Sequence, residues 1–514
     1  MTRRASNKSR RKESCPRGVR FGMIETMKIP RCMSTQHPDN VNVPFFSKSP
    51  KIGGEDEIKE AYYTYSHLGI DEQMWDVEGK EVDNYVVKKL LTTYEHFFRE
   101  NILGDEVRLT LRVPNPVEER AEAKILLETL ESIPRSFDAS ALFYQKDIAP
   151  IFEVILPMTD SAASIDHIYR YYKDFIVGRQ DKIFKKGDIT IGEWIGQFKP
   201  AEVSVIPLME DMYHQLAADT IVREYLADKK APEYGQRVFL ARSDPAMNYG
   251  VFGAVVSNKV ALMRLEKLSE DIGVALHPIL GAGSAPFRGN LSPRTVRRFT
   301  REYPSVQTFT LQSAFKYDYP LDEIRDAVQF LRGQYEPGKA SVIDAESAMT
   351  LAEPYTKAYK AEVMTLAPAV NKMAKFIPKR RDRKLHTGLF GYARSLDGVS
   401  LPRAISFTAS LYSLGMPPEL LGLSAFNRTT YNRAREIYQF FEEDLRDALR
   451  GLNPDSPYVP KELLAKIDEL GIGYEIDAQQ KQTSDQILKC LDDGRTDRLP
   501  ELVLLAGQAR RFLG

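Results

Sequence analysis

The stretch Val-Ser-Val-Ile-Pro-Leu-Met-Glu-Asp, residues 203–211, decides the fold class of this chain. Its first seven residues are mostly apolar, which is typical of a buried strand, and two carboxylates end the apolar run. A helix-like segment, residues 213–227, comes next, and a second strand-like run, residues 238–242, follows it. A strand, a helix and another strand in this order predict a parallel sheet with the helix crossing back over it.

The same alternation recurs on both sides of this unit. We predict further strands at residues 73–77, 107–113, 151–156, 274–280 and 306–311, and further helices at residues 118–131, 165–175 and 259–270. From about Asp322 onward the pattern becomes helical. Seven strands approach the eight of a barrel, so we predict an α/β fold, a (β/α)₈ barrel of the TIM type with additional, mostly C-terminal helices. A doubly wound open sheet is the alternative, but no GxGxxG motif follows an early strand.

Length and composition describe an ordinary globular protein. The 514 residues are 43% hydrophobic and 28% charged, and 71 basic side chains balance 71 acidic ones. We therefore expect no nucleic-acid partner, and we expect no membrane partner because no apolar run approaches the length of a membrane span. Three widely spaced cysteines without metal spacing indicate a reducing compartment, and we predict a cytoplasmic protein.

Charge is uneven only at the N-terminus. Residues 1–27 include a strongly basic stretch without the apolar core of a secretory signal, so we predict a disordered leader there. Beyond Pro50, no Gly/Ser-rich or Pro-rich linker and no fixed repeat divides the chain. We predict that residues 28–514 form one catalytic domain built on the barrel.

The octapeptide Met-Ser-Thr-Gln-His-Pro-Asp-Asn, residues 33–40, places an imidazole among turn-forming residues. Pro38 biases His37 toward extended geometry, and Asp39 and Asn40 favour a turn. This pattern predicts a loop in which the His37 ring is accessible and is not packed into the core. The alternative is a structural histidine, which is the commoner role of a lone imidazole.

Two carboxylates follow predicted strands. Glu210 comes after residues 203–209, and Asp244 comes shortly after residues 238–242. Carboxylates from neighbouring strand ends can share one hard divalent cation that keeps water and substrate oxygens as its other ligands. Each residue could instead cap the helix that follows it.

Two arginines are placed where an anion could bind. Arg112 ends the predicted strand 107–113, and Arg288 lies in the small-residue loop 281–290, where backbone N–H groups can approach a ligand. Guanidinium groups suit a phosphorylated substrate because they are permanently charged and bind phosphate in a bidentate manner.

The octapeptide, together with the Lys-Ile-Pro-Arg of residues 28–31, resembles the opening motif of archaeal-type phosphoenolpyruvate carboxylase. Residues 207–210 and the pair Ser243-Asp244 resemble the two metal-ligand motifs of that family, in the order the family uses. Arg112 resembles the arginine at one of its strand ends, and Arg288 resembles an arginine of its glycine-rich phosphate loop.

The loop around Arg288 reproduces only part of the repeated Arg-Gly-Gly units found in the longer enzymes of the family. The identity of a second phosphate-binding arginine therefore stays open, and Arg242 and Arg403 are the candidates. Residues 310–313, Thr-Leu-Gln-Ser, resemble a further strand end of the family. This likeness suggests Gln312 as a substrate contact, although its amide could instead satisfy backbone groups.

The resemblance implies a cytoplasmic homotetramer that depends on Mg²⁺ or Mn²⁺ and needs neither biotin nor ATP. It would condense phosphoenolpyruvate with bicarbonate to oxaloacetate and phosphate, through carboxyphosphate and an enolate held by the metal. Glu210 and Asp244 would bind the metal, the arginines would hold the phosphate, and His37 would accept the carboxyl proton of carboxyphosphate.

Two other functions stay open at this point. One is another enolate-handling barrel, a lyase or aldolase of the HpcH type, which would share the metal ligands without needing the His37 loop. The other is a nucleic-acid-binding scaffold that uses the basic leader, although the remaining body carries a net negative charge.

Overall fold

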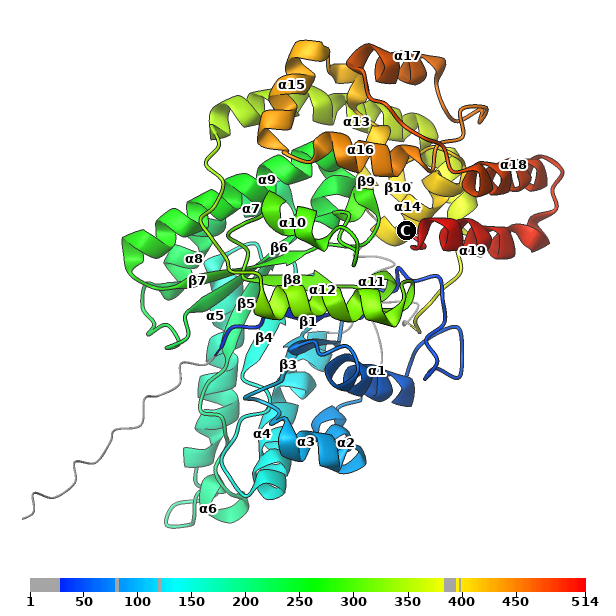
Figure 1. Ribbon diagram of the computed structural model, residues 1–514. Coiled ribbons are helices and arrows are strands. Elements are labelled where there is room, and N and C mark those ends of the chain that lie inside the picture. The colour runs from blue at the N-terminus through cyan, green and yellow to red at the C-terminus, as the bar shows by residue number, and fades with distance from the viewer. Residues whose placement is uncertain (1–27, 79–82, 119–122, 383–393, 397–398) are drawn as a thin grey trace, which may run out of the picture.

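The computed structural model describes residues 28–78, 83–118, 123–382, 394–396 and 399–514 (Figure 1). The predicted leader, residues 1–27, lies outside the described residues. Cys32 and Cys490 are buried free thiols. Within the described ranges, no helix combines the length and the apolar character needed to cross a membrane.

Eight parallel strands form a closed barrel in chain order at the centre of the molecule (Figure 1). The strands are β1 (Cys32–Ser34), β2 (Glu72–Asp76), β3 (Arg108–Arg112), β4 (Glu153–Leu156), β5 (Ser204–Met209), β6 (Gln236–Ala241), β7 (Leu276–Gly281) and β8 (Thr308–Leu311). Strand β1 closes the ring, because Met33 pairs with Glu72 of β2 on one side and with Thr310 of β8 on the other. The predicted TIM-type barrel is confirmed.

The seven predicted strands correspond to β2 through β8, and β1 is the strand that the sequence did not indicate. It consists of three residues and overlaps the octapeptide, which its turn-forming residues mark as a loop. A strand this short has no recognisable apolar run. Its pairing with two neighbours in the closed ring makes it a strand.

Helices connect the strands and surround the barrel. In chain order they are α1 (Glu55–Ser66), α2 (Val86–Thr93), α3 (Glu95–Glu100), α4 (Ala123–Tyr144), α5 (Ala162–Arg170), η2 (Tyr171–Ile176), η3 (Val177–Asp181), α6 (Ile191–Ile195), α7 (Met212–Leu216), α8 (Ala218–Leu226), α9 (Ser243–Ile272), η4 (Pro286–Arg288), α10 (Val296–Glu302), α11 (Ser313–Tyr317) and α12 (Leu321–Gly333). The predicted helix 259–270 is only the end of α9, which changes direction at Gly250, where φ is 75°.

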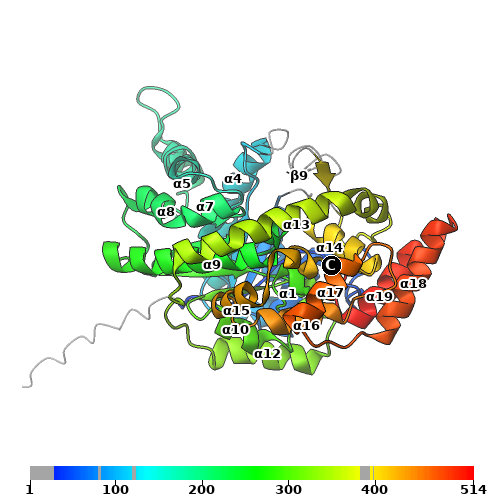
Figure 2. The same ribbon diagram turned by 90° about the horizontal axis from the view of Figure 1, so that it is seen from above.

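The chain after α12 is mainly helical, as predicted. It contains α13 (Ala345–Ala374), β9 (Arg394–Leu396), β10 (Val399–Leu401), α14 (Ala404–Ser413), η5 (Pro418–Leu420), η6 (Leu423–Ala425), α15 (Arg428–Ile437), α16 (Phe441–Leu449), α17 (Lys461–Leu470), α18 (Ala478–Asp492), η7 (Thr496–Arg498) and α19 (Leu499–Arg510). Seen from above, α13 runs beside α9 (Figure 2), and α14 and α19 lie beside the C-terminus in both views.

Side chains alternate between the inside and the outside of the barrel along each strand. In β5, Ile206 and Leu208 belong to the cluster that fills the interior, whereas Val205 and Met209 pack outward against the helices. Glu210 comes two residues after Leu208. Alternation therefore directs Glu210 toward the barrel axis, at the end where the strands finish.

At the end where the strands begin, the barrel interior contains charged side chains. Arg237 of β6 is 0% exposed and donates to Glu72 of β2 at 2.7 Å and to Glu153 of β4 at 3.0 Å. Arg108 of β3 reaches the same Glu153 at 3.3 Å. Burial opposes the charge of Arg237, but the two carboxylates raise its pKa above the ordinary value. Three strands are thus tied together by one buried cation.

Replacing Arg237 with Met should lower the free energy of unfolding by roughly 3 to 5 kcal/mol, because Glu72 and Glu153 would lose their central buried partner. Urea denaturation measures this loss. The control is Arg170→Met, since Arg170 makes exposed ion pairs with Asp166 and Asp228 that contribute at most about 1 kcal/mol. A similar small loss for both variants would contradict a structural role for the cluster.

Candidate active site

A cavity of about 560 Å³ opens where the barrel strands end. It brings together all but one of the predicted site residues, Arg242 being the exception: His37, Arg112, Glu210, Asp244, Arg288, Gln312 and Arg403. Side chains on several strand ends and on the loops that follow them line the cavity together with residues of the C-terminal helical region, among them 377–381 and 400–406. Barrel enzymes place their active sites at this end of the fold.

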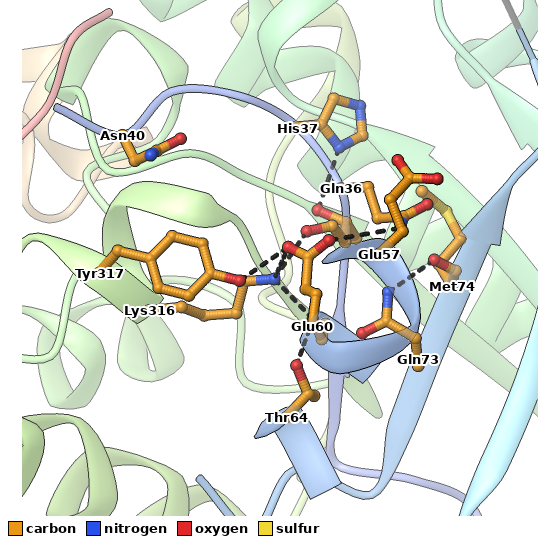
Figure 3. Close-up of polar contacts among 12 residues, drawn as sticks. Gln36, His37, Asn40, Glu57, Glu60, Thr64, Gln73, Met74, Lys316 and Tyr317 are labelled. Carbon is orange, nitrogen blue, oxygen red and sulfur yellow. Dashed lines mark hydrogen bonds and ion pairs between the residues drawn. The ribbon is translucent and has the colours of Figure 1, made fainter. Parts of the chain in front are cut away.

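The His37 loop leaves β1 and presents its ring to the cavity. Gln36 and Asp39 on either side of it are buried, whereas His37 is partly exposed. The Nδ1 atom of His37 lies 3.0 Å from the Thr35 hydroxyl oxygen (Figure 3). When Nδ1–H donates this bond, Nε2 is the basic atom of the ring. The ring is therefore held in place while it remains able to accept a proton.

The carboxylate of Glu60, on α1, lies beneath this loop and is 0% exposed. Lys316 at 3.1 Å and Tyr317 at 2.7 Å, both on α11, donate to it, and Gln36 of the His37 loop donates at 3.3 Å (Figure 3). The guanidinium of Arg381 adds two further bonds of 2.9 Å. Glu60 thus joins the His37 loop to α11 and to the segment after α13.

Lys316 fixes the backbone of the loop directly. Its ammonium donates to the Ser34 hydroxyl at 2.8 Å and to the Thr35 carbonyl at 3.0 Å, in addition to Glu60. Burial and the charge of Arg381 lower the pKa of Lys316, whereas Glu60 opposes that change. The Lys316 and Glu60 pair therefore supports the residues that precede His37.

Arg112 is held at the end of β3 by acidic residues from β2 and its following turn. It donates to both carboxylate oxygens of Asp76, at 2.8 and 3.1 Å, and pairs with Glu78 at 2.5 Å. Burial opposes its charge, but Asp76, Glu78 and Glu210 together raise its pKa. The planar group is consequently a permanent cation with a fixed orientation.

Arg288 lines the same cavity and lies in η4, in the loop after β7. Its guanidinium donates to Asp39 at 3.2 Å, to the Gly514 carbonyl oxygen at 2.8 Å, and to the side-chain oxygen of Gln312. Asp39 also accepts the Ala314 N–H at 2.7 Å. Gln312 therefore orients an arginine, which is a more specific role than satisfying backbone groups.

Glu210 and Asp244 line the same cavity, one at the end of β5 and the other in the first turn of α9. In the described part of the chain, no group of three or more His, Cys, Asp or Glu side chains is placed to hold a metal ion. Mg²⁺ commonly binds through one or two carboxylates and completes its shell with water and substrate oxygens. The pair fits such a cation.

Comparison with known sequences identifies the family of this chain. The profile described as phosphoenolpyruvate carboxylase matches residues 29–514. The chain belongs to the phosphoenolpyruvate carboxylase family. Relatives of that name include proteins from Methanothermobacter thermautotrophicus, 54% identical over 95% of this chain and 100% of the relative, and from Methanospirillum hungatei, 56% identical over the same shares. The relative from Halobacterium salinarum is 48% identical over 95% and 99%.

Family membership confirms the resemblance predicted from residues 28–40. One of the candidate site residues lies apart from the others. Arg242 does not line the cavity as far as the described residues define it. It is 0% exposed and faces Tyr303 and Tyr438, which raise its pKa although burial lowers it. Alternation explains this, because Ala241 faces the interior and Arg242 must then face outward. Of the two candidates for a second phosphate arginine, only Arg403 lines the cavity among the described residues.

Sequence reasoning also missed several residues that line the cavity of this carboxylase-family protein. Lys379, Arg380 and Arg381 follow Pro378 and bring positive charge to the cavity wall. Arg380 donates to the Val41 carbonyl, and burial lowers its pKa. The Lys-Arg-Arg run was the only sequence signal for this group.

Two buried carboxyl groups from the C-terminal helical region anchor the Arg288 loop. Glu419 accepts the Phe287 N–H and, at 2.8 Å, the Tyr412 hydroxyl. Asp444 accepts the side-chain amide of Asn290 at 2.7 Å. Burial raises the pKa of Glu419 to about 7, and it raises the pKa of Asp444 to about 7 as well.

The raised pKa of Glu419 gives a pH-dependent prediction. The folded state holds this proton more tightly than the unfolded state, so ionisation costs stability as pH rises from the ordinary glutamate range to about 7. Glu419→Gln cannot ionise. The wild type should therefore lose on the order of 3 kcal/mol of unfolding free energy relative to this variant between about pH 4 and pH 8.

Chemical denaturation of both proteins across this pH range measures the difference. Glu346→Gln removes an exposed carboxylate on α13 and controls for the general loss of one negative charge. A difference between wild type and Glu419→Gln that stays constant with pH would contradict the prediction.

Proposed function

We propose that this protein is a phosphoenolpyruvate carboxylase that joins phosphoenolpyruvate and bicarbonate to form oxaloacetate and phosphate. The observation that carries the proposal is the single cavity that gathers His37, two carboxylates and several arginines in a chain of this family. An HpcH-type lyase or aldolase is less well supported, because it needs neither the His37 loop nor a bicarbonate site. A nucleic-acid scaffold leaves the cavity without a role.

Glu210 and Asp244 would hold Mg²⁺ or Mn²⁺, and no biotin is required. When bound, such a cation supplies positive charge that stabilises the phosphate and the enolate oxygen. Arg112 and Arg288 would bind the phosphate, since both present fixed guanidinium groups on the cavity wall. Arg403, which is exposed where it lines the same cavity, would be the further phosphate ligand.

The proposed reaction begins when a bicarbonate oxygen attacks phosphorus and the bond from phosphorus to the enol oxygen breaks. Carboxyphosphate and the enolate of pyruvate result, and the arginines retain the transferred phosphoryl group. His37 then takes the carboxyl proton of carboxyphosphate, whose C–O bond breaks to release phosphate and carbon dioxide. The enolate carbon attacks carbon dioxide to form oxaloacetate.

Water must be kept from the enolate, because protonation of its carbon gives pyruvate. The contacts of Glu60 and Lys316 with the His37 loop matter for this reason. If the imidazole were displaced, carboxyphosphate would release carbon dioxide more slowly than the enolate is protonated. We further propose a cytoplasmic homotetramer, as the family resemblance implies. The buried free thiols of Cys32 and Cys490 are compatible with a reducing compartment.

The direct test incubates the protein with phosphoenolpyruvate, bicarbonate and Mg²⁺ and couples oxaloacetate to malate dehydrogenase. NADH oxidation above a boiled control, dependent on both substrates, is the expected result. Its absence would refute the proposed activity.

Glu210→Gln and Asp244→Asn should each lower turnover by roughly 100-fold or more, because a charged metal ligand contributes several kcal/mol to the transition state. Excess Mn²⁺ should restore part of the activity. Asp211→Asn is the matched control, since Asp211 caps α7 by accepting the His214 N–H at 3.0 Å, and Asn caps equally well. Unchanged metal dependence in the first two variants would contradict the proposal that these carboxylates hold the metal.

His37→Asn should reduce oxaloacetate formation by about 10² to 10⁴-fold, the usual contribution of a proton acceptor, while phosphate release falls much less. The measured quantity is oxaloacetate formed per phosphate released. His96→Asn is the control, because the His96 side chain on α3 is 89% exposed. If the ratio stayed at the wild-type value in His37→Asn, the imidazole would have only a structural role.

A further inference from the structure

Lys379 differs from the other cations that line the active-site cavity. The basic residues described in that lining are Arg112, Arg288, Lys379, Arg380, Arg381 and Arg403. Lys379 is the one lysine among them, and it is exposed. In the part of the chain that the structure describes, its ammonium makes no hydrogen bond or ion pair. An anion that enters the cavity can therefore bind this ammonium without displacing a protein carboxylate.

The two arginines first assigned to the phosphate are already held by acidic side chains. Arg112 pairs with Asp76 and Glu78, and Arg288 pairs with Asp39. A guanidinium fixed in this way keeps a rigid fork of donors, which matches the oxygens of a phosphate. The proposed reaction has a second anionic substrate, bicarbonate, and this substrate needs a cation of its own. The ammonium of Lys379 meets that need.

The residue after Lys379 is tied to the chain that leaves the His37 loop. The Arg380 guanidinium donates to the carbonyl of Val41, four positions after His37. The Arg380 carbonyl in turn accepts the Ile52 N–H at 3.0 Å. Arg380 is buried, so its contacts are shielded from water. These bonds fix the backbone next to Lys379 relative to the far side of the His37 loop.

The next residue, Arg381, is tied to the chain that enters the same loop. Its guanidinium donates two bonds of 2.9 Å to the carboxylate of Glu60. Gln36, which directly precedes His37, donates to the same carboxylate at 3.3 Å (Figure 3). Contacts on both sides of His37 therefore connect the segment that carries Lys379 to the loop that carries the imidazole.

The proposed reaction places the carboxyl group of bicarbonate beside His37. This imidazole takes the carboxyl proton of carboxyphosphate, and that carboxyl group comes from bicarbonate. A cation anchored to the His37 loop is therefore in position to bind it. An ammonium is a compact charge on a flexible stem, so it can stay with this group while bicarbonate becomes carboxyphosphate. Carbon dioxide is neutral, so the ammonium no longer holds it after the C–O bond breaks.

We propose that Lys379 binds bicarbonate, and that its ammonium donates a charge-assisted hydrogen bond to an oxygen of this substrate. This role rests on the proposed carboxylase function, within which Lys379 holds the second substrate. The cations of the cavity then divide the two anionic substrates between them. Fixed guanidinium groups bind the phosphate, and the flexible lysine binds bicarbonate.

Steady-state kinetics of the full chain in the coupled carboxylation assay test this role. Bicarbonate is varied at saturating phosphoenolpyruvate, and phosphoenolpyruvate is varied at saturating bicarbonate, both at constant ionic strength. Lys379→Met should raise the KM for bicarbonate by about ten- to a hundredfold, the usual effect of losing one charge-assisted contact. Its KM for phosphoenolpyruvate should stay near the wild-type value. Lys379→Arg keeps the charge and should restore part of the affinity for bicarbonate.

Lys375→Met is the matched control, because Lys375 is exposed at the end of α13 and does not line the cavity as the described residues outline it. Both of its KM values should equal those of the wild type, and circular dichroism checks that each variant is folded. An unchanged bicarbonate KM in Lys379→Met, or an equal rise in both KM values, would refute the role of Lys379 while the active wild type upholds the carboxylase function. A wild type that forms no oxaloacetate would refute both.

Discussion

The buried ion cluster of Arg237, Glu72 and Glu153 is the constraint on which the rest of this barrel depends. An unpaired charge in a barrel interior is strongly destabilising, so β2, β4 and β6 must meet in the one register that pairs all three groups. A shift of one residue would turn every side chain of a strand to the opposite face. This register therefore also decides which side chains face the cavity at the other end of each strand. Arg108 and Arg112 are four residues apart on β3 and therefore lie on the same face of the strand. Arg112 is the one that lines the cavity.

At the active-site end of the barrel, arginines are again paired with carboxylates, but the residues are different. Asp76 holds Arg112 and Asp39 holds Arg288, and in each pair the two residues come from different strand ends. Glu60 holds Arg381 and connects it to the loop that carries His37. Each cation is oriented by a carboxylate before substrate arrives, and preorganised charge of this kind stabilises a transition state without further rearrangement. The C-terminal helices contribute through Glu419, whose contact with the Phe287 N–H holds the loop next to Arg288.

Sequence patterns predicted most of the barrel because buried parallel strands read as apolar runs between helices. Strand β1 was beyond this reasoning, since a strand of three residues is formed by pairing with its neighbours and carries no pattern of its own. Glu210 and Asp244 were found because polar residues after strand ends share one edge of a barrel. The outward placement of Arg242 could have been predicted from the sequence, because residues 238, 240 and 242 share one face of the strand and the first two pack outward.

The sequence by itself determined the barrel class, the family and the residues that follow the strands, because these depend on local periodicity and on short motifs. Only the tertiary structure decided which charges meet. Lys316 and Glu60 are 256 positions apart, and Arg381 and Glu60 are 321 apart, yet they form one buried network under the His37 loop. Periodicity reports which face of an element a residue occupies, but it does not report what lies opposite that face. That partner is set by closure of the ring and by the packing of distant helices, where desolvation makes each buried charge depend on a specific counterion.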